Sequence, residues 1–302
     1  MKLIQPVAVS TAMLSASDVP ETDYTEWNVA TAYVVGNKVI KAATHRIYEC
    51  LVDHTGADPE TNLSGVAPKW LDLAPTNRWA MFDDVVGTKT IQTANISVTL
   101  LPGAIAGLAL MGLTGTSVNV VLKDSVDGAV AYSNTILLDD SPILSLYDWF
   151  FQPYLQKEDV ILTDIPYQYP VGELTITVVA GSGNAEVGVC KFGGILDIGH
   201  TQYGATSSIT DYSIKEADAF GNYTVVPRAF ARRANFTMQI DHAAYNKIFR
   251  QLAALRATPC IWVGTQETGY EPLSIYGFYR DFSIEIPYQT THLCTIEVEG
   301  LT

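Results

Sequence analysis

The chain has 302 residues, of which 48% are hydrophobic and 17% charged, a composition that supplies a packed core and excludes an intrinsically disordered protein. Its formal net charge of −14 is uneven: residues 1–200 hold 10 Lys+Arg against 22 Asp+Glu (net −12), and residues 201–302 hold 8 against 10 (net −2). Because an acidic surface repels phosphate, the charge argues against nucleic acid as a partner.

The first twenty residues, MKLIQPVAVSTAMLSASDVP, have the lysine and the apolar residues of a signal peptide. Gln5, Pro6, Ser10 and Thr11 interrupt the apolar run that a signal peptide requires. The sequence therefore predicts an ordered N-terminal arm. Together with the segment that follows, this arm forms a first part over residues 1–75.

An aromatic-rich segment follows, EWNVATAYVVGNKVIKAATHRIYECLVDHTGADPETNLSGVAPKW, over residues 26–70. The spacing of Trp27, Tyr33, Tyr48 and Trp70 resembles that of the small chitin-binding-type carbohydrate-binding modules. The resemblance implies a small β domain that binds carbohydrate through these four rings. Apolar sugar faces stack on exposed aromatic planes, which is why such rings suit that function.

One departure from that family's pattern bears on sugar binding. After the second tyrosine the family typically has an exposed tryptophan pair, whereas this chain has Cys50, Leu51 and Val52. Two interpretations stay open: the four aromatic residues form a weak glycan site, or they form the core of a domain too small to bury enough surface without large rings.

The central part, residues 76–199, consists of short alternating runs such as ISVTLL, SVNVVLKD and ELTITVVA between turn residues, which is typical of strands. Residues 90–122 carry no charge, but Pro102, Gly103 and Gly107 break that stretch, so we expect strands and no membrane insertion. From NRWAMFDD to AEVGVCKFGG the part resembles a galactose-binding-like jelly roll. Its most aromatic segment, SLYDWFFQPYL (145–155), is expected to pack in the core or at its edge.

The last part, residues 200–302, contains a predicted helix over 241–256, DHAAYNKIFRQLAALR. Asp241 is a natural N-cap, and Pro259 forbids continuation beyond the end. Apolar residues recur at helical spacing, at Tyr245, Ile248, Phe249, Leu252 and Leu255. A single apolar stripe predicts a helix packed on a sheet, with Phe249 buried.

The fold class predicted from these patterns is mainly β. It comprises a small N-terminal β module, a central jelly-roll-like β-sandwich and a C-terminal β-sandwich with one packed helix over 241–256.

Basic residues bunch in the segment PRAFARRANF as Arg228, Arg232 and Arg233. They are candidates for an assembly interface, because they could pair with acidic groups of a neighbouring subunit. The alternative is a solvated or locally paired strand end, as most charge clusters are.

The last hundred residues resemble the C-terminal region of bacteriophage tail-associated virion proteins, from TQYGATSSITDYSIKEADAFGNYTVVPRAFARRANFTMQI to LCTIEVEGL. Such proteins often carry a carbohydrate-module-like domain near the N-terminus. The resemblance implies a structural virion protein that is made and assembled in the host cytoplasm. Its implied partners are other virion proteins, further copies of the same chain and a cell-surface glycan.

Residues suited to catalysis or to metal binding are sparse. Five histidines show no zinc-binding spacing, and no nucleophile elbow, P-loop or dinucleotide fingerprint is present. Cys50, Cys190, Cys260 and Cys294 are widely spaced, which predicts free, buried thiols. The sequence therefore predicts no catalytic residue, no metal and no cofactor.

Three functions are weighed on this basis. The first is a non-enzymatic component of a phage tail, baseplate or collar that assembles through residues 200–302. The second is a free-standing carbohydrate-binding protein or an accessory module of a glycan-degrading system. The third is a glycoside hydrolase that uses one of the carboxylate pairs Asp83–Asp84, Asp139–Asp140 or Glu158–Asp159.

Overall fold

The computed structural model describes residues 1–302 except 142, 218–219, 268 and 302. Strands account for 48% of the chain and helices for 9%, so the predicted mainly-β class is confirmed. The uncharged stretch over 90–122 forms strands, as expected. Within the described residues no helix is long and apolar enough to cross a membrane.

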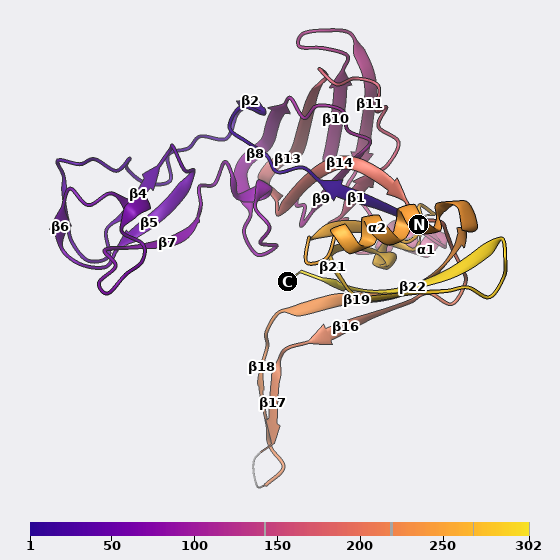
Figure 1. Cartoon of the computed structure of the whole chain (residues 1–302). Helices are drawn as coiled ribbons and strands as arrows, with labels where there is room; N and C mark the ends of the chain where they lie inside the picture. The colour runs from indigo at the N-terminus through magenta and orange to yellow at the C-terminus, as the bar shows by residue number, and fades with distance from the viewer. Residues whose placement is uncertain (142, 218–219, 268, 302) are drawn as a thin grey trace.

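One large, curled sheet runs through the body of the molecule (Figure 1). Its strands are, in spatial order, β12 (Val160–Leu162), β9 (Gly107–Met111), β14 (Val189–Asp197), β1 (Lys2–Pro6), β20 (Cys260–Val263), β21 (Ser274–Glu285), β22 (Thr291–Gly300), β19 (Phe230–Asp241) and β15 (His200–Thr201), with β16 (Thr206–Asp211) also paired to β19. The sheet thus contains strands from both the central and the C-terminal part.

Strand β1 is the junction between these two parts. It pairs antiparallel with β14 on one side and with β20 on the other. Gly193 in β14 permits the close approach, because a Cβ at that position would lie 1.9 Å from the carbonyl oxygen of Gln5. The N-terminal arm therefore belongs to the body, and the sheet continues across the expected boundary at residues 199–200.

A second sheet covers the central half of the large one. Its strands, in spatial order, are β11 (Val130–Leu137), β10 (Ser117–Lys123), β13 (Glu173–Val187), β8 (Thr90–Leu100) and β2 (Leu14–Ser17). Alternate residues of its strands point inward, such as Val98, Val120 and Ile176, and they meet Leu108 and Phe192 of the large sheet in one apolar core. A short 3-10 helix, Ala80–Phe82, contributes Met81 to the same core.

The C-terminal half of the large sheet packs against α2 (Tyr245–Ala254), which follows a 3-10 turn over His242–Ala244. Ile248 and Leu252 of α2 lie in a core with Phe236 and Trp262 of the sheet. The helix ends before the predicted residue 256, because Ala257 has a left-handed backbone with φ of 58°.

The prediction for Phe249 is wrong. Its side chain is 47% exposed, at the flank of the helix, and makes an edge contact with Phe282 of β21. Helical spacing placed it within the apolar stripe, but the buried face is narrower and centres on Ile248 and Leu252.

The small module lies apart from the body (Figure 1). It contains β4 (Lys38–Lys41), β5 (Arg46–Cys50) and β7 (Trp70–Pro75) in one sheet, β3 (Ala32–Tyr33) paired with β6 (His54–Thr55), and a 3-10 turn over Pro59–Thr61. His45 joins the module to the body: its ring stacks on Trp79 at 4.0 Å, and its Nδ1 lies 2.9 Å from a carboxylate oxygen of Glu21.

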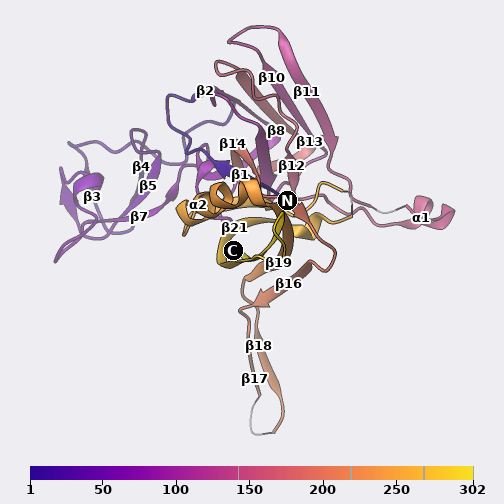
Figure 2. The ribbon, with the colours of Figure 1, turned by 45° about the vertical axis from the view of Figure 1, so that its right-hand side comes forward.

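Two elements project from the body. The first is α1 (Leu146–Phe151), which extends to the far right in Figure 2. The second is the ribbon of β17 (Ile214–Ala217) and β18 (Tyr223–Val226), which points downward in Figures 1 and 2. Another 3-10 turn, Glu271–Leu273, lies in the body between β20 and β21.

Candidate interaction surfaces

The aromatic residues expected to bind sugar mostly form the core of the small module. Trp70 is fully buried, and Tyr48 is only 2% exposed. The Trp70 indole donates a 2.9 Å hydrogen bond to the carbonyl oxygen of Ala57, and its ring meets that of Tyr33 edge-on at 5.1 Å. A sugar ring needs an accessible aromatic face, so Tyr33, Tyr48 and Trp70 do not form the expected site.

Trp27 is the exception among the four, since it is partly buried at the edge of this core. The ammonium group of Lys41 lies over its ring, 5.5 Å from the centroid. At the positions where a tryptophan pair would stand, Cys50 is buried and Leu51 and Val52 are exposed aliphatic side chains. Of its four framework aromatics, the module therefore presents one partly covered ring, that of Trp27.

The predicted arginine interface is largely used within the chain. Arg232 forms a 2.6 Å ion pair with Asp159, and Arg233 pairs with Glu297 of the neighbouring strand. Arg228 is exposed and takes part in none of the ion pairs between described residues. Glu297 lies in β22, beside β19, and Asp159 directly precedes β12, so carboxylates of the same chain pair with both Arg233 and Arg232. These two residues therefore fit the alternative of a locally paired strand end, and Arg228 stays a candidate for an assembly interface.

Among the described residues, the longest run of exposed large apolar side chains lies in residues 139–141 and 143–156, which we call the α1 arm. The expectation that segment 145–155 packs in or beside the core is wrong, since Trp149 and Phe150 are 68% and 69% exposed. The large apolar side chains of the arm that are at least half exposed are Ile143, Leu144, Leu146, Tyr147, Trp149, Phe150, Phe151, Tyr154 and Leu155. Monomeric soluble proteins rarely present so many adjacent apolar side chains unless they form a binding surface.

Hydrogen bonds give the α1 arm a defined shape. The Ser145 hydroxyl accepts from the backbone N–H of Asp148 at 3.2 Å, and the Asp148 carboxylate accepts from that of Leu144 at 3.1 Å. This reciprocal cap starts α1 locally. At the base, Asp139 and Gln156 form a β-bridge, and the Tyr154 hydroxyl donates to the Leu138 carbonyl at 2.5 Å. The exposed rings are thus held on a preformed element.

The projecting ribbon of β17 and β18 is exposed on both faces. Tyr223 and Val225 are well exposed, and so are most other described residues of the two strands. Lys215 pairs with Asp211 at 2.6 Å, and this hydrogen bond holds the pKa of the Asp211 carboxyl well below its usual range. An isolated two-stranded ribbon is marginally stable in water, so this element gains stability when it is covered.

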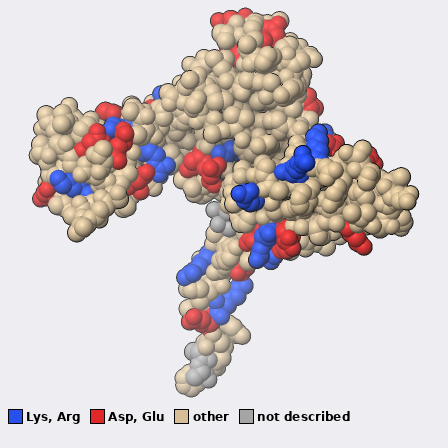
Figure 3. Space-filling model, in the orientation of Figure 1, with Lys and Arg blue, Asp and Glu red and all other residues tan. Residues whose placement is uncertain are grey.

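A basic surface on α2 was not expected from the sequence. Because Ile248 and Leu252 face inward, Lys247 and Arg250 face solvent, and Arg256 follows the end of the helix. Figure 3 shows basic side chains gathered over α2. None of the ion pairs between described residues involves these three cations. We call Lys247, Arg250 and Arg256, with the exposed Phe249, the α2 platform. The sequence contained a sign of this surface, because Lys247 and Arg250 are three residues apart on the side of the helix opposite the apolar stripe.

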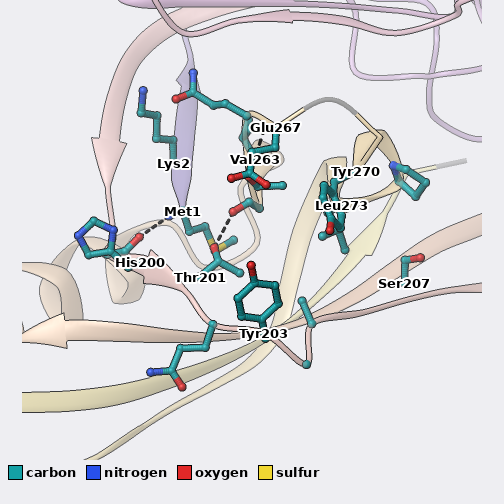
Figure 4. Close-up of a pocket in the computed structure, with 18 of the residues that line it drawn as sticks. Met1, Lys2, His200, Thr201, Tyr203, Ser207, Val263, Glu267, Tyr270 and Leu273 are labelled. Atoms are coloured by element: carbon teal, nitrogen blue, oxygen red, sulfur yellow. Dashed lines mark hydrogen bonds between the residues drawn. The ribbon is translucent and has the colours of Figure 1, made fainter. Parts of the chain in front are cut away.

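A cavity of about 720 Å³ opens beside the start of β1 (Figure 4). Its lining includes Met1, His200, Thr201, Glu267 and Tyr270. The Thr201 hydroxyl donates to the carbonyl oxygen of Gly264 at 2.5 Å, and the N-terminal amine donates to that of Gly199. Burial lowers the pKa of this amine. Backbone carbonyls therefore engage two polar groups of the cavity, the Thr201 hydroxyl and the N-terminal amine. No hydrogen bond between described residues links His200 to an acid or a nucleophile.

The carboxylate pairs considered for hydrolysis have partners in the chain. Asp84 accepts from Lys191 at 2.8 Å and from the hydroxyl of Tyr276 at 2.8 Å, and Asp159 pairs with Arg232. Hydrogen bonds from the side chain and the backbone N–H of Ser141 lower the pKa of the Asp139 carboxyl. Throughout the described residues, no three His, Cys, Asp or Glu side chains are grouped so that they could hold a metal ion.

The four cysteines are free and buried, as predicted. Burial raises the pKa of Cys190 to about 12, that of Cys260 to about 11 and that of Cys294 to about 12. Such thiols stay protonated and unreactive at neutral pH.

No protein-family model, no curated protein and no solved structure matches this chain.

Proposed function

We propose that the protein is a non-enzymatic structural component of a bacteriophage virion, in the tail, baseplate or collar, and that it assembles with other virion proteins and with copies of itself. The observation that carries the proposal is the α1 arm. Its capped helix presents Tyr147, Trp149, Phe150 and Phe151 to solvent. Apolar surface of this kind costs solubility unless a partner covers it.

The projecting ribbon supports the same function. Strands β17 and β18 pair only with each other in the described part of the chain, and the ribbon extends away from both cores. Two unsupported strands suit a contact with a second subunit, where backbone and side chains become covered on assembly. The assembling region thereby comprises the α1 arm in addition to residues 200–302.

Contact with a host glycan is a weaker part of the proposal. The small module stands away from the body, as a surface-exposed adhesion domain would. However, only Trp27 of its four framework aromatics retains an accessible part. A free-standing carbohydrate-binding protein therefore has less support than a particle component, in which many weak sites act together.

The test is whether the chain is part of a particle. Phage particles from a lysate that produces this chain are purified by density gradient, analysed by mass spectrometry, and labelled with antibody for electron microscopy. We expect the chain at a fixed ratio to the other particle proteins, with label at one place on the tail. Recovery of the chain only in the soluble fraction, as a monomer that binds sugar, would overturn the proposal.

A further inference from the structure

We propose that the α1 arm of one copy docks on the α2 platform of a second copy. This inference rests on the proposed assembly function and names the partner of its most exposed surface. The arm contributes aromatic and acidic side chains, and the platform contributes cations beside an exposed phenylalanine.

Charge complementarity is the first reason. The α1 arm holds Asp139, Asp140 and Asp148 and no Lys or Arg between residues 139 and 156. The platform holds three cations, and residues 242–266 contain no Asp or Glu. Within one copy these cations lack ion-pair partners among the described residues, so they are free to meet the arm of another copy. Complementary charge of this kind steers encounter and sets the register of docking.

The chemistry of the rings is the second reason. Guanidinium groups are attracted to the faces of Trp and Tyr, and they stack well on aromatic planes. Arg250 lies near the middle of the solvent face of α2, with Phe249 on its flank. Trp149 can cover Arg250 while the neighbouring rings of the arm extend the aromatic contact that Phe249 makes with Phe282. A lipid surface fits less well, because three carboxylates on the arm oppose anionic headgroups.

The area available is the third reason. An enclosed aromatic side chain buries roughly 150–250 Å², and about two-thirds of Tyr147, Trp149, Phe150 and Phe151 is accessible. Docking of these four rings alone would bury roughly 400–700 Å² on the arm. A stable interface needs about 800 Å² per partner, and the exposed leucines of the arm supply much of the remainder.

The position of the arm requires a second copy. In Figure 2 the arm extends away from the body on the side opposite α2, so it does not fold back on its own platform. Each copy then has one donor surface and one different acceptor surface. Such head-to-tail contacts repeat, and they produce a closed ring or an open helical stack.

Two variants of the full chain, each with one added surface cysteine, test the contact. Leu144→Cys places a thiol on the arm, and Ala254→Cys places one on the exposed side of α2. Mixed under mild oxidation, the two proteins are expected to form a disulfide-linked dimer, because the native thiols are buried and unreactive. Each variant alone is expected to stay unlinked. A dimer that forms equally well from either variant alone would overturn head-to-tail docking.

Substitutions test the chemistry by sedimentation equilibrium. Trp149→Ala and the pair Lys247→Glu with Arg250→Glu are each expected to weaken self-association at least about tenfold. The matched controls are Tyr167→Ala, a similarly exposed ring outside both surfaces, and Lys38→Glu, an exposed cation of the small module; both are expected to retain the parent affinity. Equal loss in variants and controls would overturn the proposal.

Two further outcomes separate this inference from the proposed function. If Trp149→Ala prevents incorporation into particles but the parent chain neither self-associates nor forms the mixed disulfide, the docking proposal is wrong and the virion function stands. If the parent chain floats with phosphatidylcholine vesicles and Trp149→Ala does not, while no self-association occurs, the arm is a lipid-binding element and the docking proposal is wrong. A chain absent from particles contradicts the virion function itself.

Discussion

The small module and the α1 arm are both rich in aromatic residues, yet they use them in opposite ways. In the module, Trp70 is fully buried between strands and carries a hydrogen bond on its indole nitrogen. In the arm, Trp149 is 68% exposed on a six-residue helix. Composition does not distinguish the two segments; the presence of a second layer does. Tyr33 of β3 and His54 of β6 pack edge-on against Trp70 in the module's core, and no element of the described chain covers the arm.

The largest effect of a single substitution is expected at Trp70. We expect Trp70→Ala to lower the free energy of unfolding of the small module by about 3–5 kcal/mol, because it leaves a cavity in a core of few residues. Hydrogen exchange of residues 26–75 in the full chain measures this loss. Leu71→Ala, at an exposed position on the same strand, is the control and should change protection little. Equal protection in Trp70→Ala and the parent would mean that the ring is not part of the core.

A second test concerns the helix of the body, where buried and flanking positions lie side by side. Leu252→Ala should destabilise the C-terminal half by about 2–5 kcal/mol, whereas Phe249→Ala should cost roughly half of the 3–5 kcal/mol typical of a fully buried ring. Denaturant titration of the two variants gives the difference. A larger loss for Phe249→Ala than for Leu252→Ala would contradict the observed face of α2.

Acid should affect the module more than the arm. Burial lowers the pKa of His54, whose ring lies against Trp70 and whose nitrogens have no hydrogen-bond partner among the described residues. The unfolded chain therefore takes up this proton first, and the free energy of unfolding falls as the pH drops through about 6.5 toward the lowered pKa. The hydrogen bond that Lys41 donates to Asp58 lowers the pKa of this carboxyl, so Asp58 titrates at more acidic pH.

The melting temperature of the module is measured through the hydrogen exchange of its amides, at pH values between 7.5 and 5. His54→Phe should remove most of the decrease over this range. If the parent and His54→Phe lose stability equally, another group is responsible for the pH dependence.

The smallest effect is expected at Trp149 of the arm. Trp149→Ala should change the free energy of unfolding by no more than about 0.5 kcal/mol, as is usual for exposed positions. The measurement is urea unfolding at a concentration where the parent is monomeric. A loss of several kcal/mol would show that the ring supports the body instead of a partner.

Part of the structure was predictable because it depends on local pattern. The alternation in SVNVVLK places Val118, Val120 and Leu122 inward, as observed, and the apolar stripe of α2 located a helix to within two residues of its end. Spacing also identified the four framework aromatics of the module. Whether those rings face solvent was not predictable, because that depends on β3 and β6 closing over them.

The remaining differences arise from contacts between distant residues. Arg232 and Arg233 looked like a free basic cluster, but their carboxylate partners, Asp159 and Glu297, are 73 and 64 residues away. The SLYDWFFQPYL segment has the composition of a core, and only the absence of a covering element in the described structure exposes it. The central position of β1 in the large sheet had no local signal.

That position of β1 has a consequence for how the chain folds. Lys2–Pro6 is synthesised before both of its partners, Gly193–Asp197 and Ile261–Val263, which follow some 190 and 260 residues later. Pairings so distant in sequence are slow to form, and unpaired strand edges are prone to aggregate in the meantime. The large sheet cannot close before residues 261–263 have been synthesised. We therefore expect the small module, whose contacts are local, to be the first part to become protease-resistant.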